Sequence, residues 1–366
     1  MRHSSVVKMC VCAAAFACAG SVSAVRAQTA EAEAAFKGTW FSPSSPWNLP
    51  ITAGPDVLEG SRGFIAAYLA GGRAINLNTE VWTPAVLFAR SGLPRCDVTD
   101  DEWRLEGLPL HPDMEKAIDF FAYKGDTDAS FCIFSEAKRA FYNLWNVRLE
   151  TIGVQRRLLA GAFGVFPLRG SGWWDNTLGP WTGRSSGASY CGGLVRNSEF
   201  TSGVIDHALA FGWPKRLVRA DALEQAFVFP ARTTDGSGVD PKSAAPMGAR
   251  LQLDPDLDDD QLRALGVGET ELPIARALQS YGAYLVDSTD NVMALYAESS
   301  LGRPGPVDRR HGPLPAKLLQ HARFVAPPAE TPLDSRISVG QPVHVGKEVA
   351  QHDTCILPPG DVYRTK

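Results

Sequence analysis

Short apolar runs bounded by turn residues dominate the hydrophobic pattern of this chain. Most have the length of a β-strand, and no regular crossover helices alternate with them, which favours antiparallel pairing. We therefore predict a mainly β chain in which an antiparallel β-sandwich of the jelly-roll type carries a few peripheral helices. The predicted strands are Ala74–Asn78, Pro84–Ala89, Ser130–Phe134, Ala140–Glu150, Leu194–Arg196, Val204–Trp213, Ala226–Pro230, Ala249–Leu253, Ala283–Asp287 and Val292–Glu298.

A few segments have helical features instead. A short helix is expected around Val57–Leu69, and a single turn over Ser198–Ser202. Asp258–Leu265 starts on a run of acidic residues, which stabilise a helix N-terminus. Another helix has Pro273 in its first turn and ends at Gly282, in keeping with the preferences of these residues for helix starts and stops. We expect these helices to pack on the outside of the sandwich.

The two ends of the chain differ from its middle. Residues 1–27 combine basic residues, the apolar stretch Met9–Gly20 and small residues near the cleavage point, which predicts an export signal. Residues 28–39 are expected to be a loose leader, 40–301 the sandwich domain with an N-terminal arm, and 302–366 a Pro-rich C-terminal wrap. Such a signal predicts a periplasmic or extracellular protein.

Export would change both the number of cysteines in the mature chain and their expected oxidation state. Four of the seven lie outside the signal, namely Cys96, Cys132, Cys191 and Cys355. An even number in an oxidising compartment predicts two disulfides, and three connectivities fit. We favour Cys96–Cys132, which closes a local loop, with Cys191–Cys355, which would hold the tail. None of the four belongs to a CxxC motif, so no metal site is predicted.

Composition and charge narrow the function classes. The chain is 45% hydrophobic and 21% charged, as in an ordinary globular protein. Its formal charge of −4 falls to −7 when the three basic residues of the signal are removed. An acidic chain without a basic run is a poor candidate for binding nucleic acid. Outside the signal we expect no membrane span, and signatures of serine hydrolases, NTPases, zincins and dinucleotide enzymes are absent, so no cofactor is expected.

An aromatic, glycine-rich segment is the most unusual part of the sequence. Gly170–Gly193 contains seven glycines, three tryptophans and Tyr190. In an exported protein, exposed indoles often stack on sugar rings; alternatively, the tryptophans simply cover one end of the sandwich. The predicted substrate-binding residues are Trp47, Trp173, Trp174, Trp181 and Arg232.

The candidate catalytic residues cluster shortly after this segment. A period of two along Val204–Trp213 places His207 on an apolar face, as a core histidine, a general acid or base, or a metal ligand. The same period puts Asp206 on the opposite face, and Asp235 is either a turn residue or a carboxylate at the rim. The predicted catalytic residues are His207, Glu199, Asp235, Tyr190 and Arg196.

Several segments together resemble a group of exported bacterial proteins that are similar to carbohydrate-active jelly rolls. These segments are Ser45–Ile51, Trp82–Ala85, Gly203–Leu209, Met247–Pro255 and Ile274–Gly282. The resemblance covers about residues 40–297 and implies a jelly-roll fold acting on carbohydrate, but it assigns no catalytic residue.

Three functions remain open from the sequence. The first is an exported enzyme that hydrolyses glycosidic bonds of a polysaccharide or oligosaccharide with two carboxylates drawn from Glu199, Asp235 and Asp206. The second is a polysaccharide lyase that uses a His or Tyr base and an Arg neutraliser. The third is a non-catalytic glycan-binding or envelope protein. The oligomeric state is left open.

Overall fold

The computed structural model describes residues 39–72, 74–99, 102–174, 183–302, 314–329, 343–344 and 355–357. The predicted export signal, nearly all of the leader and most of the C-terminal wrap lie outside these residues. The strands are β1 Ile75–Asn78, β2 Ala85–Ala89, β3 Arg95–Thr99, β4 Trp103–Pro109, β5 Phe131–Ser135, β6 Ala140–Trp145, β7 Arg148–Ile152, β8 Gln155–Leu159, β9 Ala162–Pro167, β10 Leu209–Pro214, β11 Arg250–Leu253, β12 Ala283–Thr289, β13 Met293–Tyr296, β14 Ala322–Val325, β15 Val343–His344 and β16 Cys355–Ile356. The helices are α2 Ser61–Leu69, α3 Met114–Lys124, α4 Asn197–Ser202, α5 Asp259–Ala264 and α6 Leu272–Ser280, with short 3₁₀ turns at Pro46–Asn48, Lys215–Leu217 and Ala316–His321.

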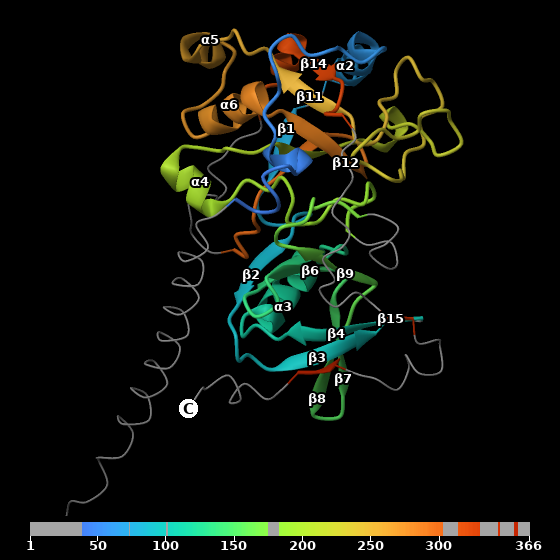
Figure 1. The fold of residues 1–366 in the computed structure, drawn as a ribbon, viewed down its shortest axis with the longest axis vertical. Coiled ribbons are helices and arrows are strands. Elements are labelled where there is room, and N and C mark those ends of the chain that lie inside the picture. The colour runs from blue at the N-terminus through green and yellow to red at the C-terminus, as the bar shows by residue number, and fades with distance from the viewer. Residues whose placement is uncertain are drawn as a thin grey trace, which may run out of the picture.

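The described residues form a mainly β structure with few helices, as predicted (Figure 1). A six-stranded sheet has the order β1-β13-β10-β12-β11-β14, and a four-stranded sheet the order β2-β5-β6-β9. Two small sheets, β15-β4-β3 and β16-β8-β7, lie beyond the four-stranded sheet. None of the helices in the described ranges has the length and apolarity that crossing a membrane requires.

The expectation of purely antiparallel pairing is corrected by three strand pairs. β1 pairs with β13, β10 with β12, and β2 with β5 in parallel. Parallel pairs require crossover connections, which here are long and irregular and contain hairpins as well as helices. Because these crossovers lack a regular strand–helix alternation, the pattern that would have indicated parallel strands is missing from the sequence. A jelly-roll arrangement is not confirmed.

The four-stranded sheet is buried on both faces. Along β5, Phe131 and Ile133 belong to the same hydrophobic core as α3, whereas Cys132 and Phe134 belong to the core of the six-stranded sheet. The alternation follows from the period of two along a strand. This sheet therefore lies between the two hydrophobic cores. Side chains on the face that looks toward the six-stranded sheet lie where the two cores meet.

Two disulfides are present, as predicted, but the favoured pairing is wrong. The bonds are Cys96–Cys355 and Cys132–Cys191. Cys132 projects from β5 toward the six-stranded sheet, while Cys96 packs against the other core. The two cysteines therefore lie on opposite sides of the four-stranded sheet and cannot meet, although they are close in sequence.

Candidate functional site

The five predicted catalytic residues separate into two groups. Arg196, Glu199 and His207 form one set of contacts, which we call the ion-pair cluster. Asp235 belongs to a second set, the carboxylate cluster, and Tyr190 lies beside it. The members of the carboxylate cluster are Arg184, Ser185, Asp235, Asp287 and Ser288.

The ion-pair cluster stands at the start of α4. Glu199 is 5% exposed, and its carboxylate accepts hydrogen bonds from Nε of Arg196 at 2.8 Å and from the Arg196 backbone N–H at 2.9 Å. Nε2 of His207 lies 3.0 Å from the same carboxylate. Burial by itself raises the pKa of Glu199, but His207 and Arg196 outweigh it and lower the pKa to about 2. Both carboxylate oxygens are engaged within the cluster.

The prediction that His207 lies on a strand is wrong, because β10 begins only at Leu209. Its Nδ1 lies 2.9 Å from the carbonyl oxygen of Ala208, and its Nε2 faces Glu199. Both ring nitrogens are therefore engaged by groups of the protein, and neither is free to contact a substrate in this arrangement. The neighbouring Asp206 is exposed and does not pair with it.

The carboxylate cluster brings Asp235 next to the end of β12. Oδ2 of Asp235 accepts a hydrogen bond from Ser288 Oγ at 2.5 Å. The adjacent Asp287 accepts one from Ser185 Oγ at 2.6 Å and faces Nη1 of Arg184 at 3.4 Å. Asp235 is thus bonded to the residue that directly follows Asp287 on β12, which brings together two carboxyl groups from distant parts of the sequence.

Asp287 has an unusual protonation equilibrium for an aspartate. Burial raises its pKa to about 6; the charge of Arg184 opposes this rise and the charge of Asp235 adds to it. A quarter of the side chain is nevertheless exposed. A carboxyl group that titrates near neutrality and still reaches solvent can both donate and accept a proton, which are the requirements for general acid–base chemistry.

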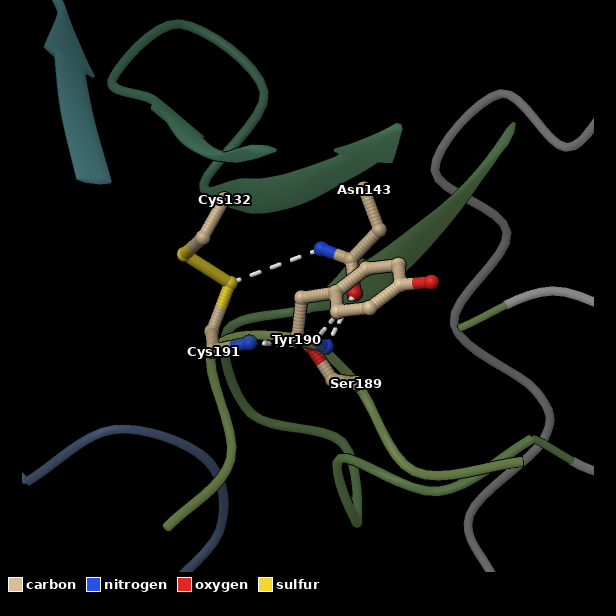
Figure 2. The surroundings of a disulfide bond; sticks show 5 residues. All are labelled: Cys132, Asn143, Ser189, Tyr190 and Cys191. Carbon is tan, nitrogen blue, oxygen red and sulfur yellow. Dashed lines mark hydrogen bonds between the residues drawn. A yellow bond between two sulfur atoms is a disulfide. The ribbon is translucent and has the colours of Figure 1, made fainter. Parts of the chain in front are cut away.

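Tyr190 is positioned by the four-stranded sheet (Figure 2). Oδ1 of Asn143 on β6 accepts hydrogen bonds from the Tyr190 backbone N–H at 2.6 Å and from Ser189 Oγ at 2.9 Å. The amide nitrogen of Asn143 donates to Sγ of Cys191 at 3.4 Å, beside the disulfide to Cys132. The loop that carries Tyr190 is therefore attached to the sheet at three consecutive residues.

The guanidinium of Arg184 lies over two aromatic rings, 5.3 Å from the Tyr190 ring centroid and 3.8 Å from that of Tyr296. Burial raises the pKa of both phenols, and the charge of Asp287 adds to the effect. Both tyrosines are therefore protonated near neutrality. They favour hydrogen bonding and stacking over the role of base that we expected for Tyr190.

The predicted aromatic binding surface is corrected by burial. Trp47 and Trp173 are each 1% exposed and stack on one another with centroids 4.9 Å apart, so neither presents a face to a ligand. The N-terminal arm can insert so deeply because Gly192 has no Cβ; one built there would lie 2.5 Å from the Trp47 ring. Trp174 is half-buried, and Trp181 lies outside the described residues.

Arg232 is half-buried and lies close to the carboxylate cluster. Its backbone N–H donates to the Ser186 carbonyl at 3.1 Å, one residue from Ser185, and its guanidinium lies 5.6 Å from the Phe229 ring centroid. A role in ligand binding therefore stays a prediction for this residue.

Sequence reasoning missed Arg184, Asp287 and Tyr296. One signal was available: Asp287 directly follows the apolar run 283–286, and polar residues at strand ends often carry function. Comparison with protein-family models, with curated proteins and with solved structures finds no match to this chain, so the geometry of the two clusters alone carries its candidate function.

Proposed function

We propose that this protein is an exported enzyme that hydrolyses glycosidic bonds of a polysaccharide at the carboxylate cluster. The observation that carries the proposal is the pair of half-buried aspartates, Asp235 and Asp287, which meet at the end of β12, where Oδ1 of Asp235 has no hydrogen-bond partner among the described residues. Glycoside hydrolysis is commonly performed by two such groups, one protonated and one ionised. The two disulfides fit an oxidising compartment outside the cytoplasm. The jelly-roll relationship indicated by the sequence is part of the proposal.

The two carboxyl groups have different tasks in this mechanism. Protonated Asp287 donates its proton to the glycosidic oxygen while the bond from that oxygen to the anomeric carbon breaks. Asp235 accepts a proton from the water that attacks the anomeric carbon. One turnover leaves Asp287 ionised and Asp235 protonated, and exchange with solvent restores both groups.

The second candidate function is that of a polysaccharide lyase, which eliminates at a uronic acid. The surroundings of Arg184 favour it. Nε and Nη2 of this guanidinium have no hydrogen-bond partner among the described residues, and the group lies beside Tyr190. A lyase needs such a cation to neutralise the uronate carboxylate. Two features rank it second: Arg184 is 3% exposed, and the raised pKa of Tyr190 opposes formation of the phenolate that would act as base.

A glycan panel separates these functions. The wild-type protein is incubated with neutral and uronate polysaccharides, while new reducing ends and the absorbance of unsaturated uronates are followed. Asp287→Asn and Asp235→Asn are each expected to lower hydrolysis by about 100-fold or more. Asp206→Asn is the matched control, because this exposed carboxylate lies outside the cluster.

The outcomes differ for each candidate. Reducing ends without absorbance support hydrolysis, and absorbance supports elimination. Binding without either product indicates a non-catalytic glycan-binding protein. If both cluster variants cleave at the wild-type rate, the carboxylate cluster is not the site of the reaction.

A further inference from the structure

Two indoles outside the carboxylate cluster are exposed. Among the described tryptophans, Trp82 is 45% exposed and Trp145 is 37% exposed, whereas Trp47, Trp173 and Trp213 are buried. Tyr123 and Phe227 are also exposed, at 86% and 37%, so exposure alone does not assign a role to an aromatic side chain. The surroundings of the two indoles therefore indicate whether they serve a purpose at the surface.

One turn, between α3 and β5, holds both residues. The backbone N–H of Trp82 donates to Oδ2 of Asp126 at 2.7 Å, and Nε1 of Trp145 donates to Oδ1 of Asp128 at 3.2 Å. The two acids are linked, because the backbone N–H of Asp128 donates to Oδ1 of Asp126 at 2.9 Å. The positions of both tryptophans are thus fixed by the same three residues of chain.

The backbone at Trp82 is in an unfavourable conformation. Its φ of 57° lies in the left-handed region, which bulky L-residues rarely adopt. The conformation is secured on both sides, by Asp126 and by the Asn78 amide, which donates to the Trp82 carbonyl at 3.1 Å. Since the ring remains exposed, the strain is not compensated by core packing, and strain of this kind is typical of ligand-binding positions.

The Trp145 ring packs against the backbone of a glycine, Gly161. A Cβ built on Gly161 would lie 3.2 Å from Cε3 and Cζ3 of the indole, so the ring rests against the bare backbone at this position. Gly161 also donates its N–H to the Trp145 carbonyl at 2.8 Å, which fixes the two residues relative to one another. The indole is therefore held firmly although more than a third of the residue is exposed.

The turn also adjoins the candidate active site. The charge of Asp128 contributes to the raised pKa of Tyr190 and of Tyr296, and the charge of Arg184 in turn lowers the pKa of Asp128. These groups therefore lie within a short electrostatic distance of one another. Trp145 also follows Asn143 by two residues on β6, and Oδ1 of Asn143 accepts the Tyr190 backbone N–H at 2.6 Å, so the two side chains lie on the same face of the strand.

We propose that Trp82 and Trp145 form a platform that stacks on neutral pyranose rings of the polysaccharide cleaved at the carboxylate cluster. Indole faces suit the axial C–H groups of a pyranose, and fixed rings lose little conformational entropy on binding. The carboxylates of Asp126 and Asp128 disfavour a uronate in the same place, because like charges repel. This proposal rests on the proposed function and adds its substrate class, a neutral polysaccharide.

Affinity electrophoresis in gels containing neutral polysaccharides tests the platform. Trp82→Ala and Trp145→Ala are each expected to weaken binding by about three- to tenfold, on the usual scale of an aromatic stacking contact. Phe227→Ala is the matched control, since Phe227 is also 37% exposed and lies in a different part of the fold. Gly161→Ala keeps both indoles but displaces the Trp145 ring, so it should also weaken binding. Melting temperatures establish that each variant is folded.

The results distinguish the platform from the proposed function. Wild-type affinity in both tryptophan variants, with hydrolysis intact, overturns the platform and leaves the function standing. Weakened binding in these variants, with no hydrolysis by the wild-type protein, supports the platform and contradicts the function. A wild-type protein that binds uronate polymers but no neutral glycan overturns the platform.

Discussion

Glu199 is a buried carboxylate whose charge is favoured by its neighbours. Its pKa is lowered from 4.5 to about 2 in the folded protein by His207 and Arg196. A lowered folded pKa stabilises the protein above the unfolded value, and this contribution disappears as the pH falls from about 4.5 toward 2. The ion-pair cluster is therefore expected to contribute to acid unfolding.

Replacing Glu199 with Gln tests this contribution. At pH 7 the variant should lose on the order of 3 kcal/mol of unfolding free energy, because the ionised carboxylate that Arg196 and His207 stabilise in the folded protein is then missing. Urea unfolding at pH 7 and pH 3 measures the effect, which should shrink at the lower pH. Glu136→Gln is the control: the pKa of Glu136 is also lowered, but its side chain is exposed, so the loss should be small. Equal losses in both variants would contradict the role of burial.

The pKa of Asp287 is shifted in the opposite direction to that of Glu199, so its effect on stability has the opposite dependence on pH. Its folded pKa of about 6 exceeds the ordinary 3.8, so the folded protein binds the proton more tightly, and stability falls as the pH rises from about 4 to 6. Asp287→Asn should therefore raise the unfolding free energy at pH 7, by about 1–2 kcal/mol after allowance for its partial exposure. The same variant should lose hydrolysis. A variant that is less stable than the wild type at pH 7 contradicts the cost assigned to the ionised form.

The pairing of Glu199 with His207 shows what a pattern of residues can and cannot predict. The sequence placed both near one another, and the helical turn over Ser198–Ser202 was expected. The strand phase assigned to His207 was wrong, because residues 204–208 take no part in a ladder and β10 starts later. Periodicity has no meaning outside a regular element, so the partner of the ring could not be deduced.

At the scale of elements, α3 was missed although its signal was present. Met114, Ala117, Ile118 and Phe121 are buried and follow the spacing of one helix face, and Gly125 ends the helix in the left-handed conformation. The periodic stretch is short and lies between strand-like apolar runs. By contrast, α5 and α6 carried clear start and stop residues, and their predicted bounds are confirmed to within a residue or two.

The N-terminal arm is held in place by aromatic stacking. Trp47 and Trp173 come from distant parts of the sequence and stack on one another. Tyr284 on β12 makes an edge-to-face contact with each of them, with centroids 5.5 Å and 5.7 Å apart. Trp173→Ala should cost about 3–5 kcal/mol, the usual range for removing a buried large aromatic side chain. Equilibrium unfolding in denaturant measures the loss, with the half-buried Trp174→Ala as a control of smaller effect. A Trp173→Ala protein of unchanged stability would contradict the core role.

At the scale of the whole molecule, the disulfides join parts that the sequence keeps apart. Peptide mapping without reduction should find Cys96 linked to Cys355 and Cys132 linked to Cys191. Replacing both members of one pair with Ser should lower stability by about 2–5 kcal/mol. Peptides that link Cys96 to Cys132 would contradict the described fold, since these cysteines lie on opposite sides of the four-stranded sheet.

The connectivity of the chain also has a consequence for its synthesis. β1, near the start, pairs with β13, and Cys96 is bonded to a cysteine 259 residues later. Neither core can be completed while the ribosome is still making the last third of the chain, so the usual order of folding from the N-terminus does not apply. We therefore expect the two cores to form only after the segment around Cys355 has been released, which is compatible with the export that we propose for this protein.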